Sequence, residues 1–203
     1  MKKVLVILAL LAVTGIASAE LVTDGDFENG ATGWAAWNNA GIADHTADYG
    51  GTAPNTDAGV WWTDGGVAQE VTGIVPGDYS FSIDTLIGHD AFQLTGDRQV
   101  IAQVDMFHWN DGGWWDYWYT AGVVSVSGLD SPAADSVISD GFDFTVTTNP
   151  EGDWTEMAKV YLHMVDAGGS GNGYWDNASI TAVPEPATMA LLGLGGLLLR
   201  RKK

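Results

Sequence analysis

The sequence predicts an all-β domain, an antiparallel sandwich of two sheets with about nine strands. Apolar residues alternate with polar ones through residues 20–182, and Gly, Asn and Asp interrupt them every eight to twelve residues. No window of about a dozen residues carries an apolar stripe of helical period with capping residues at its ends. This combination is typical of an antiparallel sandwich.

Segments with strict alternation are the expected strands. In the segment 79–84, Tyr79, Phe81 and Ile83 share one face. The same pattern occurs at 100–109, 117–126, 137–146, 159–165 and 174–181. Turns are expected at Gly65-Gly66, Pro76-Gly77-Asp78, Asp111-Gly112 and residues 149–152.

The charge of the chain is unevenly distributed. The whole sequence has 26 acidic and 8 basic residues, but residues 20–183 contain 25 acidic and 2 basic residues, a net charge of −23. Binding to phosphate requires several Lys or Arg side chains, so nucleic acid and anionic lipid are excluded as partners of this body. The absence of cysteine excludes disulfides, thiol catalysis and Cys-based zinc sites. With 46% hydrophobic residues, the chain is a folded acidic domain and not a disordered tail.

Residues 1–19 have the pattern of a helical signal peptide. Lys2 and Lys3 precede an apolar run at 4–13, and Ala17-Ser18-Ala19 provides the small residues of a cleavage site. We therefore expect an exported protein that begins at Glu20.

Residues 183–203 also contain an apolar stretch and a basic cluster, in the reverse order. Pro184-Glu185-Pro186 precedes an apolar stretch at 187–199, and Arg200, Arg201, Lys202 and Lys203 end the chain. A transmembrane helix of 13 residues spans about 20 Å, less than the roughly 30 Å of the bilayer core, which suits a transient anchor. An ordinary C-terminal membrane anchor is the alternative.

The order of these elements resembles the PEP-CTERM sorting signal of Gram-negative bacteria. The resemblance implies that the export machinery and the membrane protease exosortase are partners, and that only the tail contacts the inner membrane. It also implies a location at the cell surface or in the extracellular matrix, often in connection with exopolysaccharide.

Three parts of residues 20–182 carry a second resemblance. They are residues 24–30 with Gly33-Trp34, residues 67–71 with 76–81, and residues 174–180, which contain Asp176-Asn177. These segments resemble the jelly-roll carbohydrate-binding modules of galactose-binding-like fold, notably families four, nine and twenty-two. The resemblance implies a jelly-roll topology and binding of a sugar.

Asp24, Asp26 and Glu28 form a candidate calcium site. In a strand the three carboxylates would lie on one face, and in an irregular loop they could converge. Grouped carboxylates repel one another unless a cation intervenes, and calcium prefers oxygen ligands. In the carbohydrate-binding modules that the chain resembles, a structural calcium joins the opening segment to the closing strand, which implies Asp26 or Glu28 together with Asp176. A solvated acidic segment is the alternative.

Tryptophans cluster around a predicted hairpin at residues 109–118. A two-residue turn at Asp111-Gly112 would pair Trp109 with Trp114 and Asp105 with Trp118. The predicted glycan-binding face then contains Gln103, Asp105, Trp109, Trp114, Asp116 and Trp118, with Phe107. A three-residue loop would reverse the faces of one strand. Aromatic rings stack on sugars while carboxylates and amides bind hydroxyls, although packing of these rings beneath loops is an alternative.

No motif indicates catalysis. The histidines at 45, 89, 108 and 163 lack metal-ligand spacing, and no Gly-x-Ser-x-Gly elbow is present. We therefore expect a non-enzyme that binds neutral or calcium-bridged polysaccharide. The alternative is a structural or exopolysaccharide-associated matrix protein without a specific glycan site.

Overall fold

The computed structural model describes residues 20–50, 56–61, 64–109, 113–147, 156–165 and 168–184. The predicted signal peptide and the helix of the sorting tail lie outside these residues. In the described part, no helix is long and apolar enough to cross a membrane.

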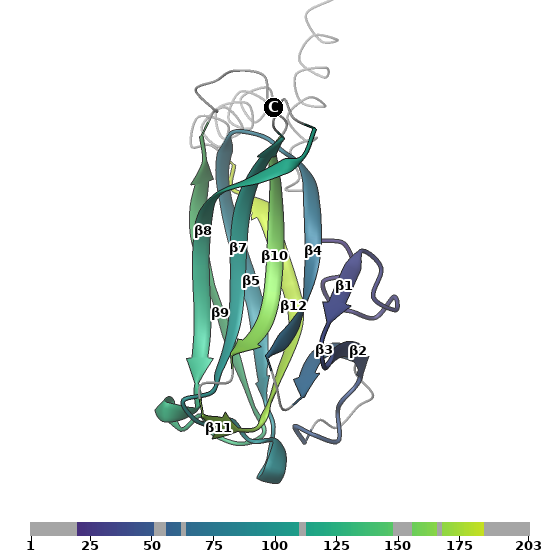
Figure 1. Cartoon of the computed structure of the whole chain (residues 1–203), viewed down its shortest axis with the longest axis vertical. Coiled ribbons are helices and arrows are strands. Elements are labelled where there is room, and N and C mark those ends of the chain that lie inside the picture. The colour runs from purple at the N-terminus through teal and green to yellow at the C-terminus, as the bar shows by residue number, and fades with distance from the viewer. Residues whose placement is uncertain are drawn as a thin grey trace, which may run out of the picture.

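Two antiparallel five-stranded sheets form a sandwich, as predicted (Figure 1). The first sheet has the order β1-β4-β10-β7-β8 and the second the order β2-β3-β12-β5-β9, while β6 and β11 form a separate ribbon. The first sheet comprises β1 (Trp34–Trp37), β4 (Gly65–Ile74), β10 (Glu156–Val165), β7 (Gln99–Trp109) and β8 (Trp115–Ser127). The second comprises β2 (Ala40–Asp44), β3 (Thr56–Trp61), β12 (Asn172–Ala182), β5 (Gly77–Ile87) and β9 (Ser136–Val146).

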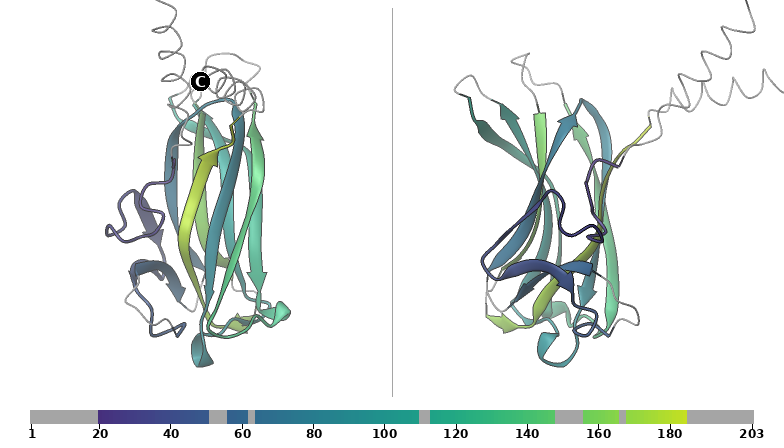
Figure 2. Two further views of the ribbon diagram at one scale, coloured as in Figure 1. Left: turned by 180° about the vertical axis from the view of Figure 1, so that it is seen from behind. Right: turned by 90° about the vertical axis from the view of Figure 1, so that its right-hand side faces the viewer.

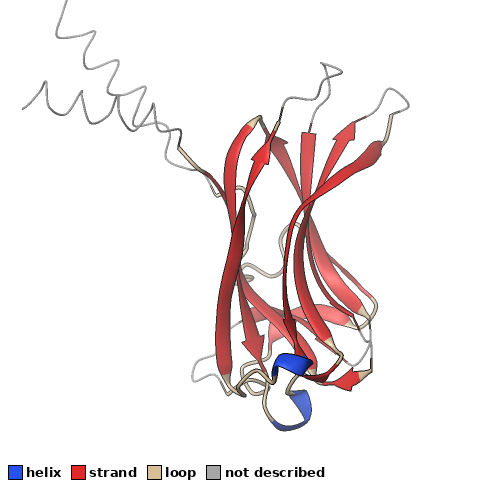
Figure 3. Ribbon diagram, turned by 90° about the vertical axis from the view of Figure 1, so that its left-hand side faces the viewer, coloured by secondary structure: helices blue, strands red, loops and turns tan. Residues whose placement is uncertain are grey.

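The two sheets face each other along their length, as Figure 2 shows from the side. At the end of the sandwich where β12 begins lie β6 (Thr95–Gly96), β11 (Gly169–Ser170) and two single-turn helices, η1 (Asp90–Phe92) and η2 (Gly128–Asp130) (Figure 3). The described part thus contains twelve strands, three more than the expected nine. All six predicted strand segments are confirmed, and the additional strands are mostly too short for an alternating pattern to be recognised.

The core lies between the two sheets. On β7, Val100, Ala102, Val104 and Met106 alternate inward, and each is almost completely buried. Phe81, Ile83, Trp175 and Ile180 approach them from the second sheet as parts of the same cluster. Because strand side chains alternate, burying these residues directs the intervening residues of β7 to solvent.

The segment that begins the domain is not a strand. Residues 22–33 form turns and bends, with positive φ angles at Asp24 and Phe27, and Glu20 makes a single bridge with Thr181. Phe27 is fully buried 5.0 Å from the ring of Trp34, whose Nε1 donates hydrogen bonds to the carbonyls of Thr23 and Asp24. Of the two alternatives left open for this acidic segment, the irregular loop is the one observed, because the segment folds around an aromatic anchor without pairing in a sheet.

Candidate functional site

We call the solvent-facing side of the β1-β4-β10-β7-β8 sheet the outer face. The strand register places its side chains in rows that cross the sheet. The first row contains Trp37, Gly66, His163, Ile101 and Ser125; the second, Ala35, Ala68, Tyr161, Gln103 and Val123; the third, Glu70, Lys159, Asp105 and Thr120. Next to them the β7–β8 hairpin pairs Phe107 with Tyr117 and Trp109 with Trp115. Aromatic rings therefore lie at opposite corners of this face, and polar groups lie between them.

A pocket of about 480 Å³ lies at the β1 corner of the outer face. Small residues provide much of its lining, and longer side chains surround them: Gly33, Ala35, Ala36, Trp37, Ala68, Glu70, Lys159 and Tyr161. A Cβ on Gly66 would lie 2.6 Å from the indole of Trp37, so the ring rests directly on the backbone. The Trp37 and Tyr161 rings meet edge to face with centroids 6.3 Å apart. Small side chains thus let a ligand approach the sheet beside two aromatic rings.

A hydrogen-bonded network occupies the centre of the outer face. The Oδ1 atom of Asp105 accepts hydrogen bonds of 2.7 Å from Gln103 Nε2 and from Thr120 Oγ1. Tyr117 joins the network, because its hydroxyl lies 3.1 Å from Thr120 Oγ1. Asp105 is only 8% exposed, so these bonds hold a nearly buried carboxylate in place beneath the surface.

His163 borders this network in the first row. Burial lowers the pKa of His163 from its ordinary value of 6.5, while the negative charges of Asp105 and Asp64 oppose the shift. The imidazole is therefore neutral at pH 7 and can both donate and accept a hydrogen bond.

The β7–β8 hairpin corrects part of the predicted binding face. Trp109 pairs with Trp115, so Gln103, Asp105 and Trp109 share the outer face with Trp115 and Tyr117. Trp118 instead packs against the hydrophobic core, and Asp116 pairs with His108. Five residues separate Trp109 from Trp115, whereas the predicted pairing of Trp109 with Trp114 left four. The odd number puts each β8 side chain on the opposite face from the predicted one, as a three-residue loop would also do. The predicted turn at Asp111-Gly112 lies outside the described residues.

Trp114 lies immediately before β8 and is 58% exposed. Its Nε1 donates a 2.9 Å hydrogen bond to Asp116 Oδ1. Trp114 and Asp116 are thus joined to each other at the tip of the hairpin, apart from the rows that contain Gln103 and Asp105.

None of the eight pocket residues was predicted as a binding residue from the sequence, including the four with long side chains, Trp37, Glu70, Lys159 and Tyr161. A signal for two of them was present, because alternation in the predicted strand 159–165 puts Lys159 and Tyr161 on one face. Trp37 had no such signal, since β1 has only four residues and its neighbour in the sheet is β4.

The solvent-facing side of the second sheet has a different chemistry. Its cross-strand pairs combine acidic and hydroxyl side chains, and Thr145 Oγ1 and Ser139 Oγ donate hydrogen bonds to Asp78 and Asp84, respectively. Short acidic and hydroxyl side chains thus satisfy one another on this sheet, while the aromatic pocket lies on the first.

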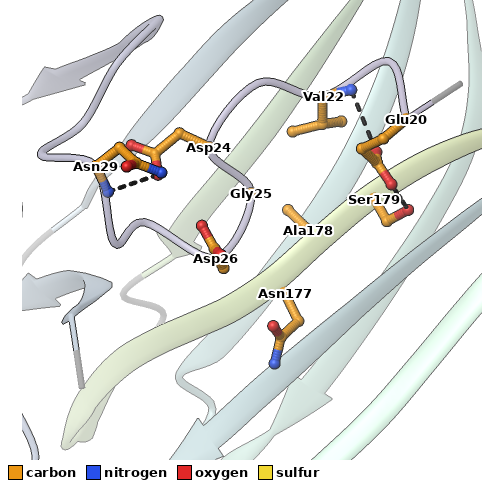
Figure 4. Close-up of a pocket in the computed structure, with 9 residues that line it drawn as sticks. All are labelled: Glu20, Val22, Asp24, Gly25, Asp26, Asn29, Asn177, Ala178 and Ser179. Atoms are coloured by element: carbon orange, nitrogen blue, oxygen red, sulfur yellow. Dashed lines mark hydrogen bonds between the residues drawn. The ribbon is translucent and has the colours of Figure 1, made fainter. Parts of the chain in front are cut away.

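Another pocket, of about 440 Å³, lies where residues 20–29 meet β12 (Figure 4). Asp24 and Asp26 extend from the opening segment, and Asn177 and Ser179 belong to β12. Asp24 accepts hydrogen bonds from the backbone amides of Asn29 and Thr32, which fixes the turn.

The three predicted calcium ligands have separate protein partners. Asp26 Oδ1 accepts from the Glu28 amide at 3.4 Å, Glu28 Oε1 from the Thr56 amide at 3.0 Å, and Asp176 Oδ1 from the Asn177 amide at 2.7 Å. Across the described ranges, no three His, Asp or Glu side chains are grouped closely enough to hold a metal. The calcium site stays a prediction.

A buried polar cluster lies at the β2–β3 edge of the second sheet. His45 Nδ1 bonds to the fully buried Asp57, and the hydroxyl of Tyr174 donates a 2.6 Å hydrogen bond to Asp48. Burial raises the pKa of Asp57 more than the neighbouring His45 lowers it. The cluster joins the loop after β2 to the centre of the sheet.

Comparisons with known proteins find matches for the C-terminal tail and for the sandwich. Residues 182–203 match the PEP-CTERM protein-sorting motif. No curated protein matches the sequence.

Solved structures similar to the sandwich include a xylan-binding domain, CBM22-1 from Paenibacillus barcinonensis. It has a TM-score of 0.51 at 14% identity, and the match covers 83% of this chain and 97% of that domain. A Stig cyclase from Fischerella sp. TAU has a TM-score of 0.54 at 15% identity, covering 83% and 99% of the two chains. The fold is therefore the jelly-roll sandwich of carbohydrate-binding modules, and because enzymes also use it, the fold alone does not assign a function.

Proposed function

We propose that this protein is exported, sorted by exosortase through its C-terminal motif, and binds polysaccharide on the outer face of its first sheet. The proposed role is non-catalytic, at the cell surface or in the extracellular matrix.

The observation that carries the binding proposal is the arrangement of the outer face. Sugar rings present apolar C–H faces and peripheral hydroxyls, so they bind best where aromatic rings lie beside fixed polar groups. Trp37 and Tyr161 provide rings beside the pocket, Trp109 and Trp115 provide them at the hairpin, and Gln103 lies between the two pairs. An extended glycan chain could contact both corners at once.

The comparison with the xylan-binding domain supports this proposal through its fold only. The two sequences are only 14% identical, so the ligand of the xylan-binding domain does not identify the glycan that the present chain binds. The outer face of this protein must be tested against several polysaccharides.

Affinity electrophoresis in gels that contain single polysaccharides tests the binding proposal. We expect at least one neutral polysaccharide to retard the protein, and Trp37→Ala and Tyr161→Ala to reduce the retardation about tenfold or more. Val137→Ala removes an exposed apolar residue from β9 in the second sheet and is the matched control. Equal retardation of all four proteins would contradict the proposal.

The sorting proposal has its own test. We expect Glu185→Ala to cause an unprocessed, membrane-associated form to accumulate in the native bacterium, while wild-type protein leaves the membrane fraction. Immunoblots of membrane and extracellular fractions measure this difference, and identical fractionation of the two proteins would count against processing at this motif.

A further inference from the structure

We propose that the pocket beside β1 recognises a neutral sugar with two adjacent hydroxyl groups. Lys159 donates a hydrogen bond to one hydroxyl, and Glu70 accepts a hydrogen bond from the other. This inference rests on the proposed glycan binding and specifies the class of sugar and the residues that select it.

Lys159 is one of very few basic residues in the domain. Residues 20–183 contain only two Lys or Arg residues, Arg98 and Lys159. Arg98 is 3% exposed, and its Nη1 donates a 2.6 Å hydrogen bond to the Gly171 carbonyl. Lys159 is therefore the one Lys or Arg of the described sandwich whose side chain reaches solvent, and it lines the pocket.

Lys159 and Glu70 form an ion pair at the pocket. The two residues are directly paired across β10 and β4, and Lys159 Nζ lies 3.5 Å from Glu70 Oε1. This distance exceeds that of a good charge-assisted hydrogen bond, so the contact is a loose ion pair. An ammonium group has three donors and a carboxylate has about four acceptor positions, so both side chains keep capacity for a ligand.

Two aromatic rings lie beside this ion pair. Lys159 Nζ lies 5.3 Å from the centroid of the Tyr161 ring, and Trp37 meets Tyr161 edge to face. A sugar packed beside Tyr161 would hold its hydroxyls at the ends of Lys159 and Glu70. Adjacent hydroxyls suit this pair, because one hydroxyl oxygen accepts from the ammonium while its neighbour donates to the carboxylate.

The charges around the pocket favour neutral sugars over acidic ones. Glu70 balances the charge of Lys159, so the ion pair is neutral, whereas the surrounding body has a net charge of −23. A uronate would have to displace Glu70 from Lys159 and enter a negative field that includes Asp105, the neighbour of Lys159 on β7. A neutral sugar meets neither obstacle.

The experiment compares neutral polysaccharides with their acidic counterparts, namely galactan with polygalacturonate, mannan with alginate, and hydroxyethylcellulose with carboxymethylcellulose. Isothermal titration calorimetry at low and high NaCl measures each affinity. We expect a neutral polymer to bind with little salt dependence, and its acidic counterpart to bind more weakly at low salt.

Two variants test the pair directly. Lys159→Met keeps the apolar stem beside Tyr161, and Glu70→Gln keeps the shape of the side chain. Each should weaken neutral glycan binding about tenfold or more, because a hydrogen bond to a charged group is lost. Asp143→Asn on β9 makes the same change of charge as Glu70→Gln but on the second sheet, and it should bind as wild type does. Exposed ion pairs contribute little to stability, so both variants should unfold at nearly the wild-type temperature.

The possible results separate this inference from the proposed function. A preference for an acidic polymer that high salt abolishes would overturn the neutral-sugar inference and leave glycan binding intact. Wild-type affinity in both variants would overturn the role of the pair. If the folded wild-type protein bound none of the six polymers, the inference would be overturned together with the glycan binding on which it rests.

Discussion

Trp109 pairs with Trp115 across the β7–β8 hairpin, and their rings meet edge to face with centroids 5.2 Å apart. This pairing determines which tryptophans can contact a ligand on the outer face. It places Trp115 with Trp109 and leaves Trp118 against the core.

The hairpin tryptophans should therefore separate into two functional groups. We expect Trp115→Ala to weaken glycan binding several-fold with a small effect on folding. Trp118→Ala should lower the free energy of unfolding by about 2–4 kcal/mol, because it removes a large side chain that packs on the core. Urea unfolding and affinity electrophoresis measure the two effects, and the opposite assignment of the two losses would contradict the observed register.

Asp105 should stabilise the centre of the outer face. Asp105→Ala leaves Gln103 and Thr120 without their shared acceptor and should reduce the free energy of unfolding by about 1–3 kcal/mol. Asp105→Asn retains an acceptor oxygen and should have a smaller effect. Urea unfolding of the three proteins is the measurement, and equal stability would show that the network has no energetic role.

His163 should make stability depend on pH. Because burial lowers its pKa in the folded protein below 6.5, the unfolded chain binds a proton more readily than the folded one as the pH falls below that value. Stability is therefore lost on acidification through this range. We expect wild type to lose more stability than His163→Gln between about pH 7.5 and pH 5.5. An NMR titration of His163 with a pKa above 6.5 would contradict the sign of the effect.

A structural calcium ion should stabilise the folded protein. If Asp26, Glu28 or Asp176 bind calcium, the ion stabilises the folded state by mass action. Millimolar calcium should then raise the midpoint of thermal unfolding by several degrees, and Asp176→Asn should reduce the shift. An unfolding midpoint that neither calcium nor a chelator changes would exclude a structural calcium site.

The sequence predicted the fold well where strands are long. Residues 100–109 and 174–181 alternate over enough positions for both their strand character and their buried faces to be read correctly, and this placed Gln103, Asp105 and Trp109 on one face. Binding of a ligand by these residues stays a prediction.

The wrong assignment and the points left open both lie where local patterns do not determine pairing. The faces of β8 depend on the number of residues between paired strands, and one additional residue moves every side chain to the other side. Asp24, Asp26 and Glu28 have the spacing of a strand, but the positive φ angle of Phe27 interrupts it so that the ring can enter the core. The pocket could not be predicted, because it forms only when β1 and β10 lie on opposite sides of β4.

The central claim is that glycan binds to the outer face of the first sheet. Two-dimensional ¹H–¹⁵N NMR during titration with an oligosaccharide of the bound polymer tests it most directly. The largest shifts are expected at the amides of Gln103 and Tyr161 and at the indole N–H of Trp37, while Ser80 and Asp143 on the second sheet stay unchanged. Shifts confined to the second sheet, or to the pocket formed by residues 20–29 and β12, would contradict this account.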